Sequence, residues 1–401
     1  MKLSAQWRKV PLRDVANVQT GLSKSQNRTG PSVLRPYLRV ANVQDGHFDL
    51  TEIKTIEVPA TQVERFSLRN GDVLLTEGGD FDKLGRGSIW NGDIPNCVHQ
   101  NHVFAVRVID STVLLPEFLA CEIQSIRAKN YFLSCAKQTT NLASINSSQL
   151  KELPILVPPL SEQRVIVNTN AAWDTAIQKN EQLITAKSLY LSRFRDQLLR
   201  KPKRASTTKL SNVTKELTAR NGKILGREAV MAITKSVGMR PMREETIAGN
   251  IERYKLVPPQ GFAYNPMRLN IGSIAKSPFD HDVLVSPDYV VFACDESKLL
   301  PSYLHHLRHS QKWVSHFELA GNGGVRVRIY YDDLGRFTFA LPPIDVQARL
   351  VQLLDAASQE IAVLTRYADA LRAQKRGLMQ KLLTGQWRLP IPKQAQEIAS
   401  V

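Results

Sequence analysis

Several short patterns in the chain carry residue types that could do chemistry. Pro287-Asp288, followed by Asp295-Glu296-Ser297-Lys298, matches a nuclease pattern in which carboxylates hold Mg²⁺ and a lysine stabilises developing charge. His305, His306 and His309 share one predicted helical patch, and His305 and His309 have the i, i+4 spacing of a metal-binding pair, but no Glu stands between them in the H-E-x-x-H manner. Patterns this short arise often by chance. We therefore expect Asp288 to cap a strand and these histidines to lie on the surface.

Two further patterns fall short of cofactor sites. The segment from Gly79 to Gly85 is rich in glycine but lacks the Lys and Ser/Thr that complete a nucleotide-binding P-loop. Asn265-Pro266-Met267-Arg268 shares only its first two residues with the Asn-Pro-Pro-aromatic loop of amino-methyltransferases, and no glycine-rich cofactor loop precedes it. We therefore expect a chain without catalytic residues, metal or cofactor of its own.

The charge of the chain points to a polyanionic partner. Its 401 residues include 53 Lys and Arg against 37 Asp and Glu, which gives a formal net charge of +16. Nucleic acid is the most common partner of so basic a protein. Hydrophobic residues make up 43% of the chain, enough for packed cores, and the length suggests two or three domains. No apolar run is long enough to span a membrane, no secretory signal is visible, and four unpaired cysteines fit a cytoplasmic protein.

Contacts with a nucleic acid would then come from polar loops. Arg can bind guanine through two hydrogen bonds, Asn and Gln can do the same for adenine, and paired glycines let the backbone approach phosphate. In the first half of the chain the candidates are Lys24, Arg28, Gly78, Gly79, Lys83, Arg86, Gln100, Asn101, Lys137 and Asn141. In the second half they are Arg240, Arg243, Tyr264, Asn265, Arg268, Asn322, Arg326 and Arg328. For any one of them an ordinary surface or turn role is an equally good explanation.

The elements that position these residues occur twice along the chain. Leu150, Pro158, Pro159 and Gln163 correspond to Leu334, Pro342, Pro343 and Gln347 with a constant offset of 184 residues. So long a period indicates duplication of a whole domain with its connector. Each Pro-Pro is followed by a long segment without proline, and Ser161 and Asp345 are suitable N-cap residues. We expect a helix from each of them to Arg200 and Gly385, respectively.

Both long segments carry a heptad stripe, which predicts a coiled coil. The first stripe has apolar residues at Trp173, Ile177, Ile184, Leu191, Phe194 and Leu198; the second includes Ile361, Leu364, Leu371, Leu378 and Leu382. Asn180, Lys187 and Lys375 interrupt the stripes, and they either set the register or face solvent at an end. The alternative is two amphipathic helices packed on separate cores. Between the helices, segments 1–157 and 204–341 alternate short β-rich runs with helical patches, as in mixed α/β domains.

Several of these segments are similar to specificity subunits of type I restriction–modification systems. The similar residues are Pro158 to Arg164, Leu378 to Arg388, Gly71 to Asp80, Gly85 to Gly87, Gln100 to Phe104 and Tyr264 to Ile274. The resemblance covers nearly the whole chain. Two departures concern the helix ends: Asp345-Val346-Gln347 replaces a Ser-Glu-Gln form, and the first helix ends in Lys201-Pro202 in place of Leu-Thr-Gly.

The resemblance implies a non-catalytic subunit of α+β class. It has two target-recognition domains (1–157 and 204–341), two conserved helices (158–203 and 342–388) that form an antiparallel coiled coil, and a tail (389–401). Each domain would read one half of a bipartite, asymmetric DNA target. Two methyltransferase subunits would methylate adenine with S-adenosylmethionine, and two restriction subunits would supply ATP- and Mg-dependent restriction. The alternative is an architectural coiled-coil DNA-binding scaffold without methyltransferase partners.

Overall fold

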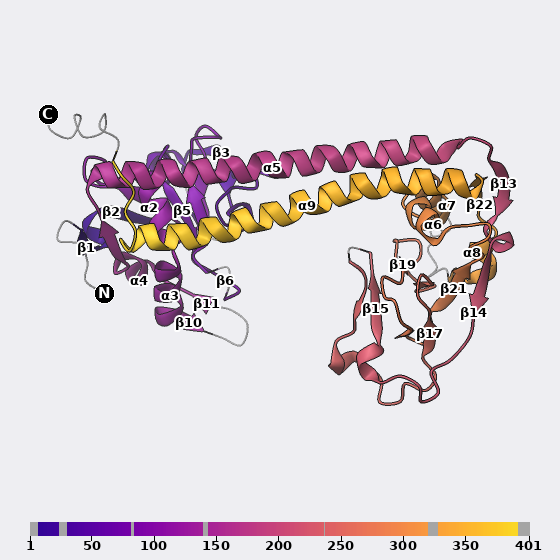
Figure 1. The fold of residues 1–401 in the computed structure, drawn as a ribbon. Helices are drawn as coiled ribbons and strands as arrows, with labels where there is room; N and C mark the ends of the chain where they lie inside the picture. Colours follow the sequence, from indigo (N-terminus) through magenta and orange to yellow (C-terminus); the bar gives the residue numbers. More distant parts are fainter. Residues whose placement is uncertain are drawn as a thin grey trace. The chain divides into compact units, whose positions relative to one another are not determined.

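The computed structural model describes residues 7–23, 30–81, 84–138, 143–235, 237–319 and 328–391. The chain divides into two compact units, each built from two stretches of sequence. The first unit consists of 1–179 and 368–401, and the second of 180–367. The two halves of the sequence thus each contribute a domain, and each long helix contributes residues to both units (Figure 1).

The first unit centres on a four-stranded sheet in the order β2-β9-β5-β7. β5 is buried along its whole length, as expected for the apolar run Val73 to Thr76 in the interior of a sheet. The helices α2 to α4 join this sheet in one core. The strands of the unit are β1 (Arg8–Pro11), β2 (Ala16–Thr20), β3 (Ser32–Leu38), β4 (Lys54–Pro59), β5 (Val73–Thr76), β6 (Gly78–Gly79), β7 (Gly87–Ile89), β8 (Val98–His99), β9 (Val103–Val108), β10 (Lys137–Gln138), β11 (Ala143–Ser144) and β12 (Pro154–Val157). Its shorter helices are α1 (Val63–Phe66), α2 (Pro116–Ile123), α3 (Ile126–Cys135) and α4 (Ser147–Lys151).

The second unit has the corresponding four-stranded sheet, in the order β14-β21-β18-β19. Its strands are β13 (Ser206–Lys209), β14 (Thr214–Leu217), β15 (Met231–Thr234), β16 (Gly238–Pro241), β17 (Lys255–Val257), β18 (Phe262–Tyr264), β19 (Ile274–Lys276), β20 (Val283–Val285), β21 (Val290–Cys294) and β22 (Thr338–Leu341). Its shorter helices are α6 (Pro301–Leu307), α7 (Gln311–Leu319) and α8 (Tyr331–Gly335). In both units the first strand pairs antiparallel with the strand that precedes the long helix, β1 with β12 and β13 with β22.

A buried glutamine in the first unit explains the repeated Pro-Pro-x-x-x-Gln motif. Gln163 is fully buried, and its amide nitrogen donates hydrogen bonds to the carbonyl oxygens of Val113 (2.9 Å) and Pro158 (2.8 Å). Its amide oxygen accepts a hydrogen bond from the backbone N–H of Leu115 (2.8 Å). One side chain therefore ties the start of the long helix to the turn that precedes α2. We call this arrangement the glutamine clamp.

The second unit repeats the glutamine clamp at the predicted offset. Gln347 is also fully buried, donates to the carbonyl oxygens of Lys298 (2.7 Å) and Pro342 (2.8 Å), and accepts from the N–H of Leu300 (2.9 Å). The same hydrogen bonds thus connect the same elements in both units, although the intervening sequences differ. Duplication of the scaffold, expected from the connector sequences alone, extends to its buried polar contacts.

The two long helices are α5 (Leu160–Arg200) and α9 (Ile344–Leu383). Each begins one residue earlier than predicted, so Ser161 and Asp345 lie in the first turn instead of at the cap. Two prolines precede each helix, at 158–159 and at 342–343. Because proline has no backbone N–H and disrupts a helix interior, neither helix can extend past them towards the N-terminus, and both starts are fixed within a residue. Gly385 follows the end of α9 with a φ of 68° and donates its N–H to Leu382, as expected of a helix-terminating glycine.

Within each unit, α5 and α9 run side by side in opposite directions (Figure 1). In the second unit Asn180 contacts Leu364 and Lys187 pairs with Glu360 (2.8 Å), so the partner number falls as the α5 number rises. In the first unit Asp174 pairs with Lys375. The predicted α+β fold with an antiparallel coiled coil is therefore confirmed.

The heptad stripes face inward along both helices. Every predicted stripe residue is buried or half-buried, whereas the other residues between 174 and 190 are exposed. The polar residues in the stripes are paired within their own units. Asn180 is 8% exposed and donates to the carbonyl oxygen of Leu364 (2.9 Å), and Lys187 and Lys375 form ion pairs with the opposite helix. Of the two explanations that the sequence left open, register-setting contacts now have the structural support.

Candidate nucleic-acid interface

Three predicted residues of the second unit come together beyond the end of β18. Asn265 opens a tight turn: its side-chain oxygen accepts from the N–H of Met267 (2.9 Å), and its carbonyl oxygen accepts from the N–H of Arg268 (2.9 Å). The N–H of Ile329 donates to the carbonyl oxygen of Pro266 (3.1 Å), which places Arg328 beside the same turn. Arg268 and Arg328 are exposed, so their guanidinium groups are available to a ligand.

A tyrosine that the sequence did not single out completes this group. Tyr289 is half-buried and shares a hydrogen bond with the Asn265 side chain. Burial raises the pKa of its phenol, while Asn265 and the charge of Arg268 oppose that shift. The amide, the phenol and the two guanidinium groups form a polar surface that can donate to phosphate or to base edges. We call Asn265, Arg268, Tyr289 and Arg328 the turn cluster.

The hairpin of β15 and β16 lies against the same region and carries the other described candidates of the second unit. Arg240 is exposed on β16 and stands opposite Ala232 in the register. Arg243 is exposed just after the hairpin. A Cβ placed on Gly272 would lie 3.4 Å from the Lys235 side chain. The hairpin therefore approaches the loop that follows Arg268. Lys235 is an exposed cation that sequence reasoning missed.

Tyr264 is a correction to the predicted set. Its side chain has no exposed area and packs in the core with Phe262, Phe292 and Ile274. Burial raises the pKa of its hydroxyl. The ring cannot stack on or bind a base, because β18 runs between β21 and β19 and the sheet covers it. The adjacent residue, Asn265, is half-buried and remains a candidate for the interface.

In the first unit, Arg86 and Gln100 meet at one backbone turn. The guanidinium of Arg86 donates to the carbonyl oxygen of Val40 (3.3 Å), and the Gln100 side chain accepts from the N–H of Val40 (3.2 Å). Both side chains are half-buried. They therefore hold the turn at Val40, and their remaining donor groups are those that a nucleic acid can use.

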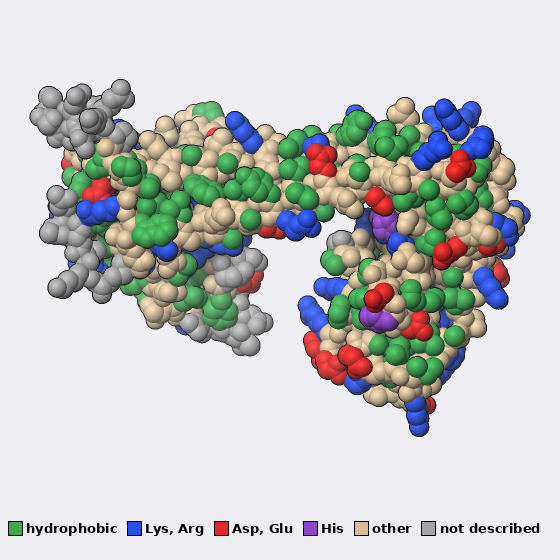
Figure 2. Space-filling model, viewed as in Figure 1, with side chains coloured by type: hydrophobic (Ala, Val, Ile, Leu, Met, Phe, Trp, Pro, Cys, Tyr) green, Lys and Arg blue, Asp and Glu red, His purple; other side chains and the backbone are tan. Residues whose placement is uncertain are grey.

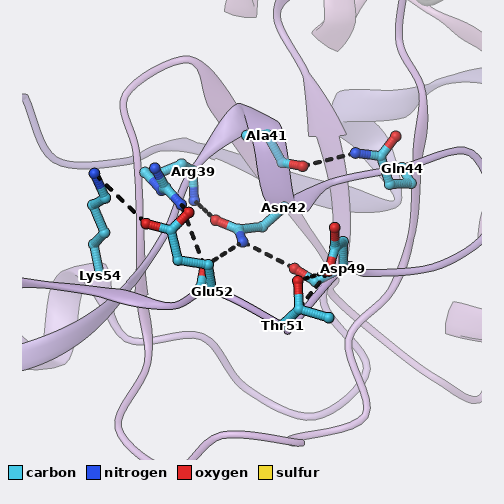
Figure 3. Close-up of polar contacts among 8 residues, drawn as sticks. All are labelled: Arg39, Ala41, Asn42, Gln44, Asp49, Thr51, Glu52 and Lys54. Atoms are coloured by element: carbon cyan, nitrogen blue, oxygen red, sulfur yellow. Dashed lines mark hydrogen bonds and ion pairs between the residues drawn. The ribbon is translucent and has the colours of Figure 1, made fainter. Parts of the chain in front are cut away.

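The segment that follows Val40 is held by its own polar network (Figure 3). Asn42 is 3% exposed, and its amide donates to the carbonyl oxygens of Asp49 (2.9 Å) and Glu52 (3.0 Å) while its oxygen accepts from the N–H of Arg39 (2.9 Å). Lys54 lies 3.7 Å from the Glu52 carboxylate. A buried asparagine with three backbone partners makes the loop rigid, which suits a surface that must present side chains in fixed positions. No sequence motif marked this network.

Asn101 is a further candidate of the first unit, and it lies near the segment that contains Gly78 and Gly79. Its amide contacts the His102 ring (3.3 Å), whose other nitrogen pairs with the Glu77 carboxylate (2.5 Å). Gly78 and Gly79 follow as β6, which pairs with β11. A Cβ on Gly78 would lie 3.0 Å from the Ala143 carbonyl oxygen. The glycine therefore permits close approach of a strand, and contact of this pair with a phosphate stays a prediction.

The remaining candidates fall into two groups. Lys137 is exposed on β10, which pairs with β11 in the same small sheet. The others lie outside the described residues: Lys24, Arg28, Lys83, Asn141, Asn322 and Arg326.

The nuclease pattern does not assemble a site. Asp288 precedes β21 and Asp295 follows it, and five residues of strand at about 3.3 Å each separate them by roughly 16 Å. Asp295 accepts from the Ser297 hydroxyl (2.6 Å) and pairs with Lys298 (2.7 Å), a local turn contact. Among the described residues, no group of three or more His, Cys, Asp or Glu could hold a metal ion.

Surface exposure, expected for the three histidines of this helix, is wrong for His306. His306 is 2% exposed and its Nε2 lies 2.7 Å from the Asp355 carboxylate. Burial lowers the pKa of His306, and the hydrogen bond to Asp355 opposes that shift. α6 faces α9 through this residue, which explains why a histidine of this helix is structural.

Comparison with known proteins decides what this scaffold is. The family described as "Type I restriction modification DNA specificity domain" matches residues 5–211. The chain belongs to this family. The match covers the first domain and α5, and DNA recognition within a restriction–modification complex, as a non-catalytic subunit, is the role it gives the chain.

Individual relatives extend the similarity to both halves. The MjaX type I restriction enzyme specificity subunit of Methanocaldococcus jannaschii is 23% identical, over 96% of this chain and 94% of that protein. The EcoKI specificity subunit of Escherichia coli is 29% identical over 38% of this chain and 32% of its own length. A solved chain from a study of assembly and conformational transition of the type I R-M system has a TM-score of 0.61 at 16% identity, covering 96% of this chain and 99% of that chain. This likeness shows the fold.

No described helix is long and apolar enough to cross a membrane.

Proposed function

We propose that this chain reads a bipartite, asymmetric DNA sequence, with residues 1–157 contacting one half and residues 204–341 the other. The observation that carries the proposal is the duplicated scaffold with unlike surfaces. Both units have the same sheet order and the same glutamine clamp. The intervening sequences have little similarity, as expected if each domain recognises a different sequence.

Base reading falls to different groups in the two domains. In the second domain the turn cluster supplies guanidinium and amide groups, and Arg240 and Arg243 add positive charge beside it. In the first domain Arg86, Gln100, Asn101 and Lys137 are the described candidates. Contacts from Arg and Lys to phosphate position the domain, and two-point contacts from Arg, Asn or Gln to base edges discriminate by about 1–3 kcal/mol each.

The helices α5 and α9 set the distance between the half-sites in this proposal. At about 1.5 Å per residue, a helix the length of α5 spans roughly 60 Å. One turn of DNA is about 34 Å. A helix of this length is sufficient to hold two recognition domains on successive turns of a duplex, so the number of bases between the half-sites would follow from the helices and not from either domain.

The catalytic work belongs to partner subunits. Two methyltransferase subunits carrying S-adenosylmethionine would methylate adenine in the recognised sequence, and two restriction subunits using ATP and Mg would cleave unmodified DNA. The complex would act in the cytoplasm. The family match supports DNA and methyltransferase partners, and the numbers of subunits are part of the proposal.

Adenine-methylation sequencing tests the proposal. The chain would be expressed with the methyltransferase subunit of its own system in a host free of adenine methylation, and the methyltransferase would also be expressed alone. A split asymmetric motif that requires this chain is the expected result. A continuous motif, or methylation independent of the chain, would refute it and favour an architectural scaffold.

A further inference from the structure

Three cations of the second unit lie beside α6. Arg195 belongs to α5, Lys276 is the last residue of β19, and Arg308 directly follows α6. All three residues are half-buried, and Lys276 donates a hydrogen bond to Ser302 of α6 (3.3 Å). Figure 2 shows histidine, basic and acidic side chains at the surface where the long helices meet the domain of this unit. We call Arg195, Lys276 and Arg308 the cation group.

No carboxylate pairs with the cation group. Among the residues that the structure describes, none of its three members forms an ion pair with Asp or Glu. The acidic residues whose charges act on the group are Asp355 and Asp196. Asp355 lies 2.7 Å from Nε2 of His306, and Asp196 accepts a hydrogen bond from the N–H of Gln311 (2.7 Å). Both carboxylates are therefore held by other groups, and the positive charge is in excess.

Two donors of the cation group are also buried without a partner. The Nε atoms of Arg195 and Arg308 have no hydrogen-bond partner in the described part of the chain. Burial lowers the pKa of Arg308 to about 10, and the charge of Arg195 adds to that shift. Burial likewise lowers the pKa of Arg195. A buried charge without a counterion is unfavourable, so an anion bound between these guanidinium groups would stabilise both of them.

The first unit shows that the scaffold does not need the charge of Arg308. The Arg308 guanidinium donates to the carbonyl oxygen of Ile274 (2.8 Å), the first residue of β19. In the first unit Gln124, which directly follows α2, donates to the carbonyl oxygen of Gly87 (2.8 Å), the first residue of β7. A neutral amide thus makes the same contact between helix end and strand. The charge at Arg308 serves something other than this attachment.

The other two cations also have neutral counterparts in the first unit. Lys276 ends β19, and Ile89 ends β7, the edge strand of the corresponding sheet. Arg195 corresponds to Met379 with the 184-residue offset of the connectors, and Met379 packs in the core of the first unit. The three charges are therefore particular to the second unit, where they come from three separate elements.

We propose that the cation group binds one phosphate group, either in a DNA backbone or as free phosphate. Two guanidinium groups and one ammonium group can donate to several oxygens of a tetrahedral anion at once. His305 adds a further donor: its Nδ1 lies 3.3 Å from the Arg308 guanidinium, which has no acceptor, so Nδ1 accepts and Nε2 carries the hydrogen. The inference goes beyond the proposed function, because the phosphate site is separate from the turn cluster and reads no base.

Substitutions that copy the first unit test the inference. Arg195→Met and Arg308→Gln introduce the residues found at the corresponding places, and the glutamine can keep the hydrogen bond to the Ile274 carbonyl. Arg193→Gln is the matched control, since Arg193 is exposed on the same helix two residues before Arg195. Isothermal titration calorimetry of the full chain measures inorganic phosphate binding at constant ionic strength. Fluorescence anisotropy over a salt series measures binding of a DNA duplex.

The wild-type chain should bind one phosphate, and each variant should raise the dissociation constant about 10-fold or more, as expected for loss of a charge-assisted hydrogen bond. The control should stay within about 2-fold of wild type, since exposed charges contribute little. A duplex salt slope reduced by about 1 in both variants identifies a DNA phosphate as the occupant. Lost phosphate binding with unchanged duplex binding identifies free phosphate.

Phosphate and duplex affinities in Arg195→Met and Arg308→Gln that match those of Arg193→Gln would overturn the inference. Reduced hydrogen-exchange protection of the second unit in Arg308→Gln would also overturn it, because the charge would then be structural. Either result leaves the proposed function standing. The proposed function fails separately, if the wild-type chain directs no split methylation motif.

Discussion

Replacement of Gln163 should expose how strongly the glutamine clamp stabilises the first unit. The side chain is fully buried and satisfies one N–H and two carbonyl groups of the backbone. Gln163→Ala leaves the N–H of Leu115 without its partner, which costs about 1–3 kcal/mol, and the two carbonyls and the vacated volume add to this. We expect a total loss of about 3–5 kcal/mol in the free energy of unfolding, in the range reserved for broken buried networks.

Gln163→Glu separates hydrogen bonding from packing, because it preserves the shape. A carboxylate there would face the carbonyl oxygens of Val113 and Pro158 in a site without water. The folded-state pKa of the introduced acid must therefore rise above its unfolded value of about 4.3. A group whose pKa is raised on folding contributes its stability below the unfolded pKa and loses it as pH rises. The variant should accordingly weaken by up to about 1.4 kcal/mol per pH unit above pH 4.3.

The assay is urea denaturation of the full chain at pH 5 and pH 8, with hydrogen exchange to identify which unit opens. Gln178→Ala and Gln178→Glu are the matched controls, since Gln178 is exposed on the same helix. Protection should fall in the first unit and not in the second. A Gln163→Ala value within about 0.5 kcal/mol of its Gln178 control, the usual spread for surface changes, would refute the reasoning.

Four further substitutions have expected outcomes. Arg268→Ala and Arg328→Ala should each weaken DNA binding: a lost phosphate contact weakens binding at every sequence and reduces the slope of log affinity against log salt by about 1, and a lost base contact reduces discrimination by about 1–3 kcal/mol. Fluorescence anisotropy that shows neither change would remove that residue from the interface. Asn180→Leu should stabilise the second unit by about 1 kcal/mol in thermal denaturation, because a buried polar residue in a heptad stripe fixes register at a cost in stability; a loss of stability would contradict this. His306→Gln should flatten the decline in stability between pH 7 and pH 5: burial lowers the folded-state pKa of His306 despite Asp355, so its contribution is present above the unfolded pKa and is lost as pH falls. An unchanged pH dependence would count against the burial argument.

The helices were the most predictable part of the fold. Their signal is local: prolines fix the starts, and a heptad spacing of apolar residues fixes the buried face. The 184-residue offset of the sequence is also present in the structure, where Gln163 and Gln347 have corresponding hydrogen-bond partners. The glutamines themselves were visible in the sequence, but their function was not, because their partners lie about 50 residues away along the chain.

The candidate interface was less predictable, for two physical reasons. Tyr264 looked like an exposed aromatic beside a polar turn, yet the position of β18 inside the sheet buries it. The sequence contains no signal for which strands become central. Conversely, Tyr289 acts through a contact with Asn265 in a different strand connection, and Asn42 acts through backbone groups of its own loop that no motif marks. The net charge predicted the class of ligand, a nucleic acid. It could not indicate where on the surface the sixteen excess positive charges lie.

The duplicated glutamine clamp bears on how such a chain can change its specificity. The clamp and the strand pair β1–β12, or β13–β22, attach each domain to its helix through backbone groups and one glutamine, independent of the loops that would meet DNA. A recognition loop can therefore be exchanged without disturbing the attachment. This predicts that exchange of residues 204–341 for the domain of another family member changes one half-site of the methylated motif and leaves the other half-site and the spacing intact. Altered bases in both half-sites, read by the same methylation sequencing, would show that the domains are coupled through more than these shared backbone contacts.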